Sequence, residues 1–247
     1  MADTASCLDD LVAWAIGRGA QLHGCAPAPV PNGGRGIVAR TAIAPGSPVA
    51  TVPVRLLLTA DGASDDARLA SAIRGRNYRG RQVLAMRLLH ERSKGASSHY
   101  SAYVNALPQH YCCLCAWSPK QAARMGCASA IDRASALRAE LHAEWMAVTP
   151  ALVALGLDPA LSTLESYAWA HMTVLSRSVY VPGGGEAGAL VPLGDLFNYA
   201  PPAGPAPILP AAALSLLPMP WCDETAMAAM ADAAVFGDGA FDAKSGW

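Results

Sequence analysis

The stretch Leu190-Val191-Pro192-Leu193-Gly194-Asp195-Leu196-Phe197-Asn198-Tyr199 is the most informative part of the chain, because it places two polar side chains in an apolar run. Asp195 and Asn198 are costly among such neighbours unless each finds a partner. Ser176-Arg177 lies shortly before, at the end of a run with helical periodicity, and Arg177 is positioned to supply a fixed cation. Together these residues predict a pocket that holds a small zwitterion.

The composition of the whole chain fits a protein with a sizeable core. It has 247 residues, of which 53% are hydrophobic, and a formal net charge of −1. This length suits one large domain or two modest ones. A net charge near zero with scattered arginines leaves no basic footprint for nucleic acid or for an anionic membrane. We therefore expect neither of these as a partner.

The sequence carries no recognisable targeting or membrane segment. Its first residues include Asp3, Asp9 and Asp10, whereas a secretory signal needs a basic start and an apolar run, and an organelle transit peptide is rich in Arg and poor in acids. The most apolar late segment, 208–219, contains two prolines and is shorter than the roughly 18–20 residues of a membrane helix. We expect a cytoplasmic or nuclear protein.

No metal site is expected from the cysteines or from the histidines. The seven cysteines are an odd number in a chain without a secretory signal, which indicates reduced thiols. The thiol cluster at 112–115 does not follow the usual zinc spacing, and His90-Glu91-x-x-Lys94 lacks the second histidine of a zincin helix. Neither a Gly-x-Ser-x-Gly elbow nor a Walker loop is present.

Hydrophobic periodicity predicts strands near the N-terminus and helices in the middle. The expected elements are a helix over 8–19, a Pro/Gly-rich passage over 27–36, strands over 37–41, 49–52 and 54–59, and helices over 82–94 and 131–148. Ser162 and Glu165 form a capping-box pattern that predicts a further helix to about Tyr180. Its buried face is expected to carry Ala168, Met172, Leu175 and Val179.

The stretch around Asp195 resembles the cofactor-binding motif of SET-domain methyltransferases, in the class related to the RuBisCO large-subunit methyltransferase. In that class a Ser-Arg pair precedes a Leu-Val-Pro-x-x-Asp-x-x-Asn-His segment, and Tyr199 stands here in place of the histidine. Gly34-Arg35-Gly36 matches the Gly-x-Gly that opens the class. Residues 98–117 follow the Ser-x-Tyr-x-x-Tyr-x-x-x-Leu-Pro pattern that begins its helical insert.

The resemblance implies an α+β fold. It predicts a SET domain of small β-sheets that is split by a helical insert, with the C-terminal part incomplete. The expected parts are residues 1–66 for the N-terminal part of the SET domain, 67–165 for the insert, and 166–247 for a C-terminal part truncated before a Tyr-Gly motif.

The resemblance also implies a cofactor and the residues that bind it. The cofactor is S-adenosyl-L-methionine, and the expected binding residues are Gly34, Arg35, Gly36, Arg177, Asp195, Asn198 and Tyr199. From the residues alone, simpler interpretations remain open. The glycines fit a plain turn, Arg177 fits a cation at a helix end, and Asn198 fits a turn residue.

The implied function is that of a protein-lysine N-methyltransferase with a protein substrate. In SET enzymes a tyrosine near the C-terminus orients the lysine amine, and no tyrosine follows Tyr199 in this sequence. We therefore expect no catalytic residue in this chain and impaired activity. The alternative is a non-catalytic SET-like protein that acts as a protein-binding module. A third possibility is methylation of a non-lysine acceptor such as histidine, and the sequence does not identify the substrate.

Overall fold

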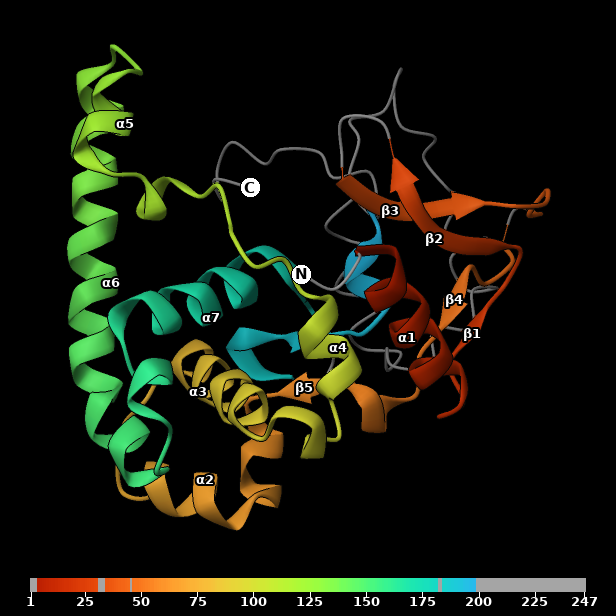
Figure 1. The fold of residues 1–247 in the computed structure, drawn as a ribbon, viewed down its shortest axis with the longest axis horizontal. Helices are drawn as coiled ribbons and strands as arrows, with labels where there is room; N and C mark the ends of the chain where they lie inside the picture. The colour runs from red at the N-terminus through yellow and green to blue at the C-terminus, as the bar shows by residue number, and fades with distance from the viewer. Residues whose placement is uncertain (1–3, 31–33, 45, 182–183, 199–247) are drawn as a thin grey trace, which may run out of the picture.

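Small antiparallel sheets and a layer of helices make up the protein (Figure 1). The computed structural model describes residues 4–30, 34–44, 46–181 and 184–198. The α-helices are α1 (Thr4–Ile16), α2 (Ala67–Ile73), α3 (Gly80–Ser93), α4 (Ser101–Ala106), α5 (Pro119–Ala123), α6 (Ala128–Ala154) and α7 (Leu164–Arg177). The strands are β1 (Gln21–Leu22), β2 (Cys25–Val30), β3 (Gly34–Ala39), β4 (Ala50–Thr51), β5 (Leu58–Thr59), β6 (Ser178–Val179) and β7 (Ala189–Leu190).

Seven short 3-10 helices connect these elements in the described part of the chain. They are η1 (Val54–Leu56), η2 (Asp61–Asp65), η3 (Gly95–Ser97), η4 (Leu114–Ala116), η5 (Pro159–Leu161), η6 (Gly185–Ala187) and η7 (Gly194–Leu196). The predicted strand over 54–59 is therefore wrong in its first half, which is η1, and right only at β5.

The sheets bring together segments that are far apart in the sequence. In the three-stranded sheet the order is β5-β7-β6, and β7 pairs antiparallel with both neighbours. Leu58 of β5 and Ser178 of β6 both lie opposite Leu190 of β7, which is fully buried. This sheet joins the N-terminal part of the chain to the stretch that contains Asp195. It therefore positions the candidate site.

The strand β2 was not predicted, because Pro27 and Pro29 suggested a loop. It pairs with β3 over its full length, and Pro27 lies opposite Ile37. Just before β2, the Gly24 carbonyl accepts a hydrogen bond from the Arg40 amide. Hydrogen-bonded pairs alternate along an antiparallel ladder, so the backbone N–H groups of the even-numbered residues of β2 point toward β3. Both prolines fall on positions where the missing N–H costs no ladder bond.

The helix α3 lies at the centre of the helical layer and packs against α4, α6 and α7. It is buried on most of its circumference, with Leu84, Met86, Leu88 and Leu89 fully enclosed. The apolar side chains of α3 thus form the centre of the core, and its polar side chains are the ones that find partners or reach the surface. The long helix α6 forms one edge of the molecule in Figure 1, and α5 packs on the end of it that points away from the body.

The helix α7 differs from the prediction at both ends. Its N-cap is Thr163, whose hydroxyl accepts from the Ser166 amide, whereas Ser162 ends the preceding η5. Its last residue is Arg177, because Ser178 and Val179 leave the helix to form β6. The predicted buried face is also partly wrong. Met172 is buried, but Leu175 and Val179 are 39% and 42% exposed.

Two predictions about the whole chain have different outcomes. The α+β class with small sheets and a large helical segment is confirmed. The division of the chain at residues 66 and 165 stays a prediction, and most of the predicted third part, 166–247, lies outside the described residues.

None of the described helices combines the length and the apolar character needed to cross a membrane. The cellular compartment stays a prediction.

A polar cluster joins the start of α2 to the end of α3. The carboxylate of Asp66 caps α2 by accepting from the amides of Arg68 and Leu69. Its other oxygen lies 3.0 Å from His90 Nε2 and 2.9 Å from Lys94 Nζ. Partial burial raises the pKa of the Asp66 carboxyl, but these hydrogen bonds and charges outweigh it and hold the pKa well below its usual value.

We predict that Asp66 stabilises the fold at neutral pH and loses this effect in acid. Its carboxylate is charged in both folded and unfolded chains above about pH 5, so the full contribution is present there. The contribution is lost as pH falls below the unfolded pKa of about 3.9 toward the lower folded value. Replacement of Asp66 by Ala should lower the free energy of unfolding by about 0.5–2 kcal/mol at pH 7. The deficit relative to wild type should shrink steadily below pH 4.

Thermal unfolding followed by circular dichroism from pH 7 to pH 3 measures this. Asp66→Asn is the matched control, because its amide oxygen still caps the helix while the charge is gone. It should recover part of the stability lost in Asp66→Ala. Stability curves of wild type and Asp66→Ala that stay parallel down to pH 3 would contradict the assignment.

Candidate active site around the Asp195 loop

The loop that follows β7 turns sharply and directs Asp195 into the protein. Leu193 has φ +69°, a value that is uncommon for a residue other than glycine. Its side chain is fully buried, and this packing holds the unfavourable backbone in place. The short helix η7 starts at Gly194 and places the Asp195 side chain inside, where it is 1% exposed.

The Asp195 carboxylate is bound from two other helices. The Nη1 atom of Arg177, at the end of α7, donates to both the carbonyl oxygen and Oδ2 of Asp195, each at 3.1 Å. The hydroxyl of Tyr103, on α4, donates to the same Oδ2 at 3.0 Å. A buried charge is stable in a protein only when it is paired and hydrogen-bonded in this way.

The protonation states follow from burial and from these contacts. Burial raises the pKa of the Asp195 carboxyl, against the attraction of Arg177 and the hydrogen bond from Tyr103. Burial and the neighbouring carboxylate raise the pKa of Tyr103 far above its usual value, so its hydroxyl stays a donor. For Arg177 burial lowers the pKa, but the charge of Asp195, the neighbouring Tyr111 and the hydrogen bonds with both together outweigh burial, and the net shift is upward. Arg177 therefore stays a cation.

The predicted glycine motif meets this loop at Asn198. The Nδ2 atom of Asn198 donates to the Arg35 carbonyl at 3.1 Å. A Cβ atom added at Gly36 would lie 2.6 Å from that same Nδ2, closer than real Cβ contacts. Glycine at position 36 therefore leaves room for the Asn198 amide in this position, which a Cβ atom would displace. Gly34 differs, because a Cβ there has open space and its φ of +71° is the constraint.

A cavity of about 1260 Å³ lies at this junction. It is lined by residues from the start of α1, from β3, from α4 with the segment after it, and from the Asp195 loop: Ser6, Cys7, Asp10, Gly34, Arg35, Ser101, Ala102, Asn105, Leu107, Pro108, Gln109, Arg177, Asp195, Leu196 and Asn198. Five of the seven predicted binding residues line the cavity, and a sixth, Gly36, lies next to Asn198. The seventh, Tyr199, lies outside the described residues.

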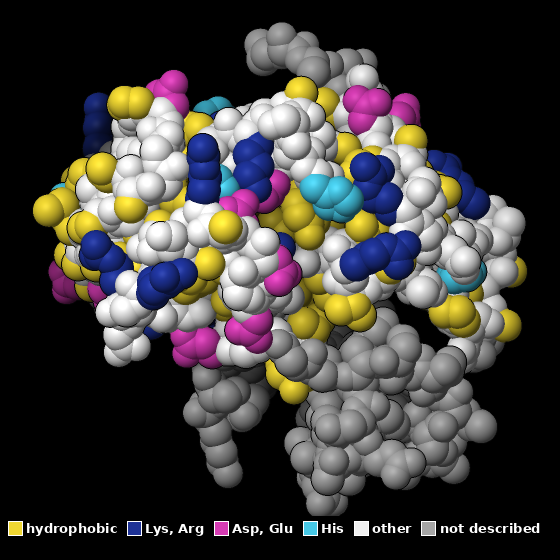
Figure 2. All heavy atoms as spheres, turned by 90° about the horizontal axis from the view of Figure 1, so that it is seen from below, with side chains coloured by type: hydrophobic (Ala, Val, Ile, Leu, Met, Phe, Trp, Pro, Cys, Tyr) yellow, Lys and Arg dark blue, Asp and Glu magenta, His cyan; other side chains and the backbone are white. Residues whose placement is uncertain are grey.

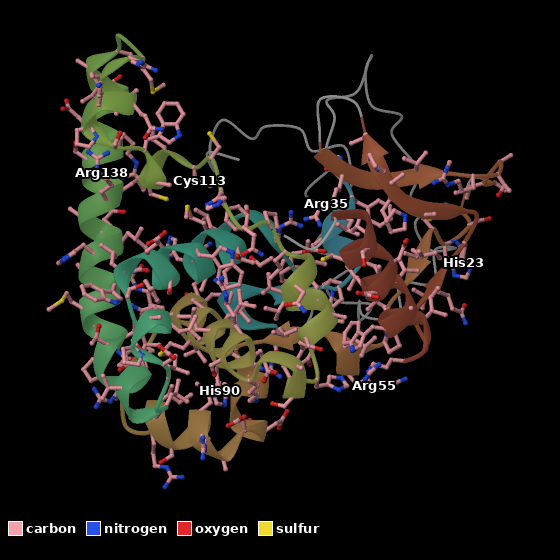
Figure 3. All side chains as sticks on the ribbon, in the orientation of Figure 1. His23, Arg35, Arg55, His90, Cys113 and Arg138 are labelled. Carbon is pink, nitrogen blue, oxygen red and sulfur yellow. The ribbon has the colours of Figure 1, made fainter. Side chains whose placement is uncertain are left out.

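Two arginines and two aspartates line the cavity, but Asp10 on α1 is exposed, whereas Asp195 is enclosed. Arg35, labelled in Figure 3, lies on β3 beside the Asp195 loop and makes no ion pair or side-chain hydrogen bond with any described residue. Burial, and then the nearby charge of Arg177, lower its pKa. Two guanidinium groups therefore face one enclosed carboxylate. Within the described residues, Arg177 Nε and Asp195 Oδ1 are also buried without hydrogen-bond partners. The arrangement suits a ligand that brings an anionic group.

The structure adds two tyrosines that we did not predict to belong to the site. Tyr103 falls in the 98–117 pattern that begins the helical insert, yet its hydroxyl donates to the Asp195 carboxylate. Tyr111 lies beside Arg177, and its hydroxyl accepts a hydrogen bond from Thr173 of α7. Tyr103 is 92 positions from Asp195. The sequence therefore gives no local signal that the two meet.

The other candidate sites do not form a metal centre in the described part of the chain. No cluster of three or more histidine, cysteine or acidic side chains there has the geometry to hold an ion. His90 instead joins the Asp66 cluster, and Cys113 comes directly before η4, which packs against α6. The thiols at 112, 113 and 115 are all free.

Comparison with known proteins gives one curated relative and several solved structures. No protein-family model matches the chain. The Arabidopsis thaliana protein SET DOMAIN GROUP 40 is 30% identical over 172 residues, which is 69% of this chain and 35% of that protein. This chain thus spans about a third of the length of that relative.

The solved structures share the fold at lower identity. The SET domain of LSMT bound to lysine and AdoHcy has a TM-score of 0.68 and 20% identity, covering 79% of this chain and 44% of that one. Rubisco LSMT bound to sinefungin and monomethyllysine has a TM-score of 0.69 and 18% identity, covering 82% and 47%. Rubisco LSMT bound to AdoMet has a TM-score of 0.66 and 20% identity, covering 78% and 45%.

We predict that loss of the Tyr103 hydroxyl destabilises the protein through Asp195. Tyr103→Phe removes one of the hydrogen bonds to a buried carboxylate, and a bond to a charged group contributes about 1.5–3 kcal/mol. Tyr167→Phe is the control, because Tyr167 is also fully buried but donates at 3.4 Å to Glu144, which is more exposed. Urea unfolding should show the larger loss for Tyr103→Phe. Equal losses in the two variants would contradict the role of Tyr103.

Proposed function

This chain is a SET-domain protein of the RuBisCO large-subunit methyltransferase-like class, and on this premise we propose that it binds S-adenosyl-L-methionine and presents it to a lysine of a protein substrate. The observation that carries the proposal is the charge arrangement of the cavity. Arg35 and Arg177 face a single enclosed carboxylate, and the glycine at position 36 leaves room for the Asn198 amide that also lines the cavity.

The residues of the cavity fit this cofactor in their chemistry. Its methionyl end is a zwitterion, which needs a cation for the carboxylate and hydrogen-bonding oxygens for the ammonium group. Guanidinium groups bind carboxylates strongly, and Arg177 keeps a buried Nε without a partner. Asp195 keeps a buried oxygen without a partner. Solved structures of the class bound to AdoMet, AdoHcy and sinefungin support the same ligand chemistry.

We assign the residues the following roles. Arg177, together with Arg35, holds the cofactor carboxylate, and Asn198 hydrogen-bonds the methionyl end. The backbone of Gly34-Arg35-Gly36 lies against the cofactor, because no Cβ intervenes at the glycines. Asp195 fixes Arg177 and the loop, and Tyr199 is proposed to pack near the adenine. When bound, the cofactor supplies an electrophilic methyl group.

Transfer of a methyl group to lysine makes a further demand on the protein. The acceptor amine must be neutral and aligned with the methyl group, although lysine has a reference pKa of about 10.4. The resemblance assigns this task to a tyrosine that follows the Asp195 loop. No tyrosine follows Tyr199 among the 247 residues. The alternative proposal is that the chain acts as a non-catalytic module that binds a partner protein.

We predict that Asn198→Ala and Arg177→Ala weaken cofactor binding in a version of the chain extended through a Tyr-Gly motif. The loss of a hydrogen bond whose partner is left unsatisfied costs about 1–3 kcal/mol, or roughly 5- to 150-fold in affinity. Arg177 should cost as much or more, because its bond is charge-assisted. Isothermal titration with S-adenosyl-L-methionine measures both effects.

Arg133→Ala is the matched control, because Arg133 is an exposed residue of α6 that pairs with Glu140 on the same helix. It should bind like wild type. Circular dichroism must show folded protein for each variant, since Arg177 also supports Asp195. Wild-type affinity in both Asn198→Ala and Arg177→Ala would overturn the cavity assignment.

We further predict that the 247-residue chain transfers methyl groups slowly or not at all. Catalysis depends on interactions that are stronger in the transition state than in the bound substrate, and the tyrosine expected to make them is not among these residues. A tritium-transfer assay against cell extract, with the extended version as positive control, measures this. Robust labelling by the 247-residue chain would show that a residue present here, such as Tyr180, performs that role.

A further inference from the structure

A second, smaller hollow lies beside the large cavity. Its volume is about 110 Å³, and its lining includes Arg92, Ser101, Asn105 and Gln109. The last three residues also line the large cavity. The two spaces therefore share one wall, formed by α4 and the segment that follows it. A molecule that occupies the large cavity lies next to the small hollow.

Arg92 is held in a fixed direction at this hollow. It comes from the last turn of α3, and its guanidinium carbon lies 4.2 Å from the ring centre of Trp169 on α7. Trp169 is itself fixed, because its indole N–H donates to the Pro108 carbonyl at 2.8 Å. Stacking on an aromatic face removes much of the freedom of an arginine side chain. The guanidinium N–H groups of Arg92 are thus oriented before a ligand binds.

The guanidinium of Arg92 has no anionic partner among the described residues. The side chain is half-buried, and burial lowers its pKa. An acidic residue, Glu91, also lines the hollow. However, Lys94 Nζ donates to its Oε1 at 2.6 Å, and the Ser98 hydroxyl donates to its Oε2 at 2.5 Å. Glu91 is therefore already committed to other donors. Arg92 remains a cation with capacity to bind an anion.

The polar groups around Arg92 are of the kind that bind a carboxylate. Ser101 contributes a hydroxyl, and Asn105 and Gln109 contribute amide N–H groups. Gln109 makes only a long bond of 3.4 Å to the Leu107 carbonyl. A planar guanidinium pairs with a carboxylate through two parallel hydrogen bonds, and the side groups can bind the remaining lone pairs.

We propose that this hollow binds the carboxylate of an aspartate or glutamate side chain in the protein substrate. The inference rests on the proposed function, because it takes the large cavity as the place where cofactor and substrate meet. Small-ligand pockets measure about 300–1000 Å³, so a cavity of about 1260 Å³ leaves room for a peptide segment beside a cofactor. An acidic residue close to the target residue would then reach Arg92. Arg92 is a specificity residue in this scheme.

The same chemistry would suit the carboxylate of a free small molecule, and the experiment separates the two sources. Nuclear magnetic resonance follows the indole N–H signal of Trp169, identified with Trp169→Phe. The probes are N-acetylglutamate amide, its neutral glutamine counterpart, glutarate and inorganic phosphate. The proteins are wild type, Arg92→Met and Arg81→Met. Arg81 is an exposed residue of the same helix and provides the matched loss of charge.

The acetylglutamate amide should shift the Trp169 signal saturably, and the glutamine counterpart should not. Arg92→Met should weaken this binding at least tenfold, whereas Arg81→Met should leave it unchanged. Glutarate that binds more than tenfold tighter than the capped amino acid would overturn the assignment to a polypeptide. Phosphate that binds as tightly as the acetylglutamate amide would overturn the carboxylate assignment in favour of a general anion site. The absence of any saturable shift would overturn the subsite itself.

A parallel titration with S-adenosyl-L-methionine distinguishes this proposal from the proposed function. If the capped glutamate binds through Arg92 but the cofactor does not bind, the cofactor assignment fails and the carboxylate subsite stands. If the cofactor binds but the capped glutamate does not, the subsite fails and the cofactor assignment stands.

Discussion

The carboxylate of Asp195 is the point where separate parts of the chain meet. It receives hydrogen bonds from Tyr103 on α4 and from Arg177 at the end of α7, while its own loop reaches β3 through Asn198. An enclosed charge is tolerated only when such partners are in place, so the carboxylate fixes the relative positions of these elements. Loss of one partner is expected to destabilise the arrangement of the whole site rather than a single contact.

The sheets and the central helix bring these partners together. The strand β7 pairs with β5 and β6, which places the loop after β7 next to the last turn of α7. The buried helix α3 packs against both α4 and α7 and so sets the distance between Tyr103 and Arg177. The strained backbone at Leu193 then turns Asp195 inward. The core thus supplies the rigidity that a preorganised polar site needs.

Charge distribution links this geometry to function. Figure 2 shows one face of the molecule on which Lys and Arg side chains are interspersed with Asp and Glu, without a broad region of one sign. Within the described residues, Arg35 in the large cavity and Arg92 in the small hollow make no ion pair. Both are partly desolvated, and burial lowers the pKa of each. Partly buried cations without partners are costly, and a ligand with anionic groups would offset that cost. The cofactor carboxylate and an acidic substrate residue are the two ligands that we propose.

The sequence and the tertiary structure determined different features of this protein. Hydrophobic periodicity in the sequence predicted the main helices, because it is local information. The α+β class and the set of binding residues around Gly34, Arg177 and Asn198 were implied by the resemblance of short motifs to a known family. The sequence did not predict β2, since the ladder positions of Pro27 and Pro29 depend on the pairing partner. Tyr103 and Arg92 were likewise found only in the structure. Their roles arise from contacts with residues far away in the chain, and only the folded core brings such residues together.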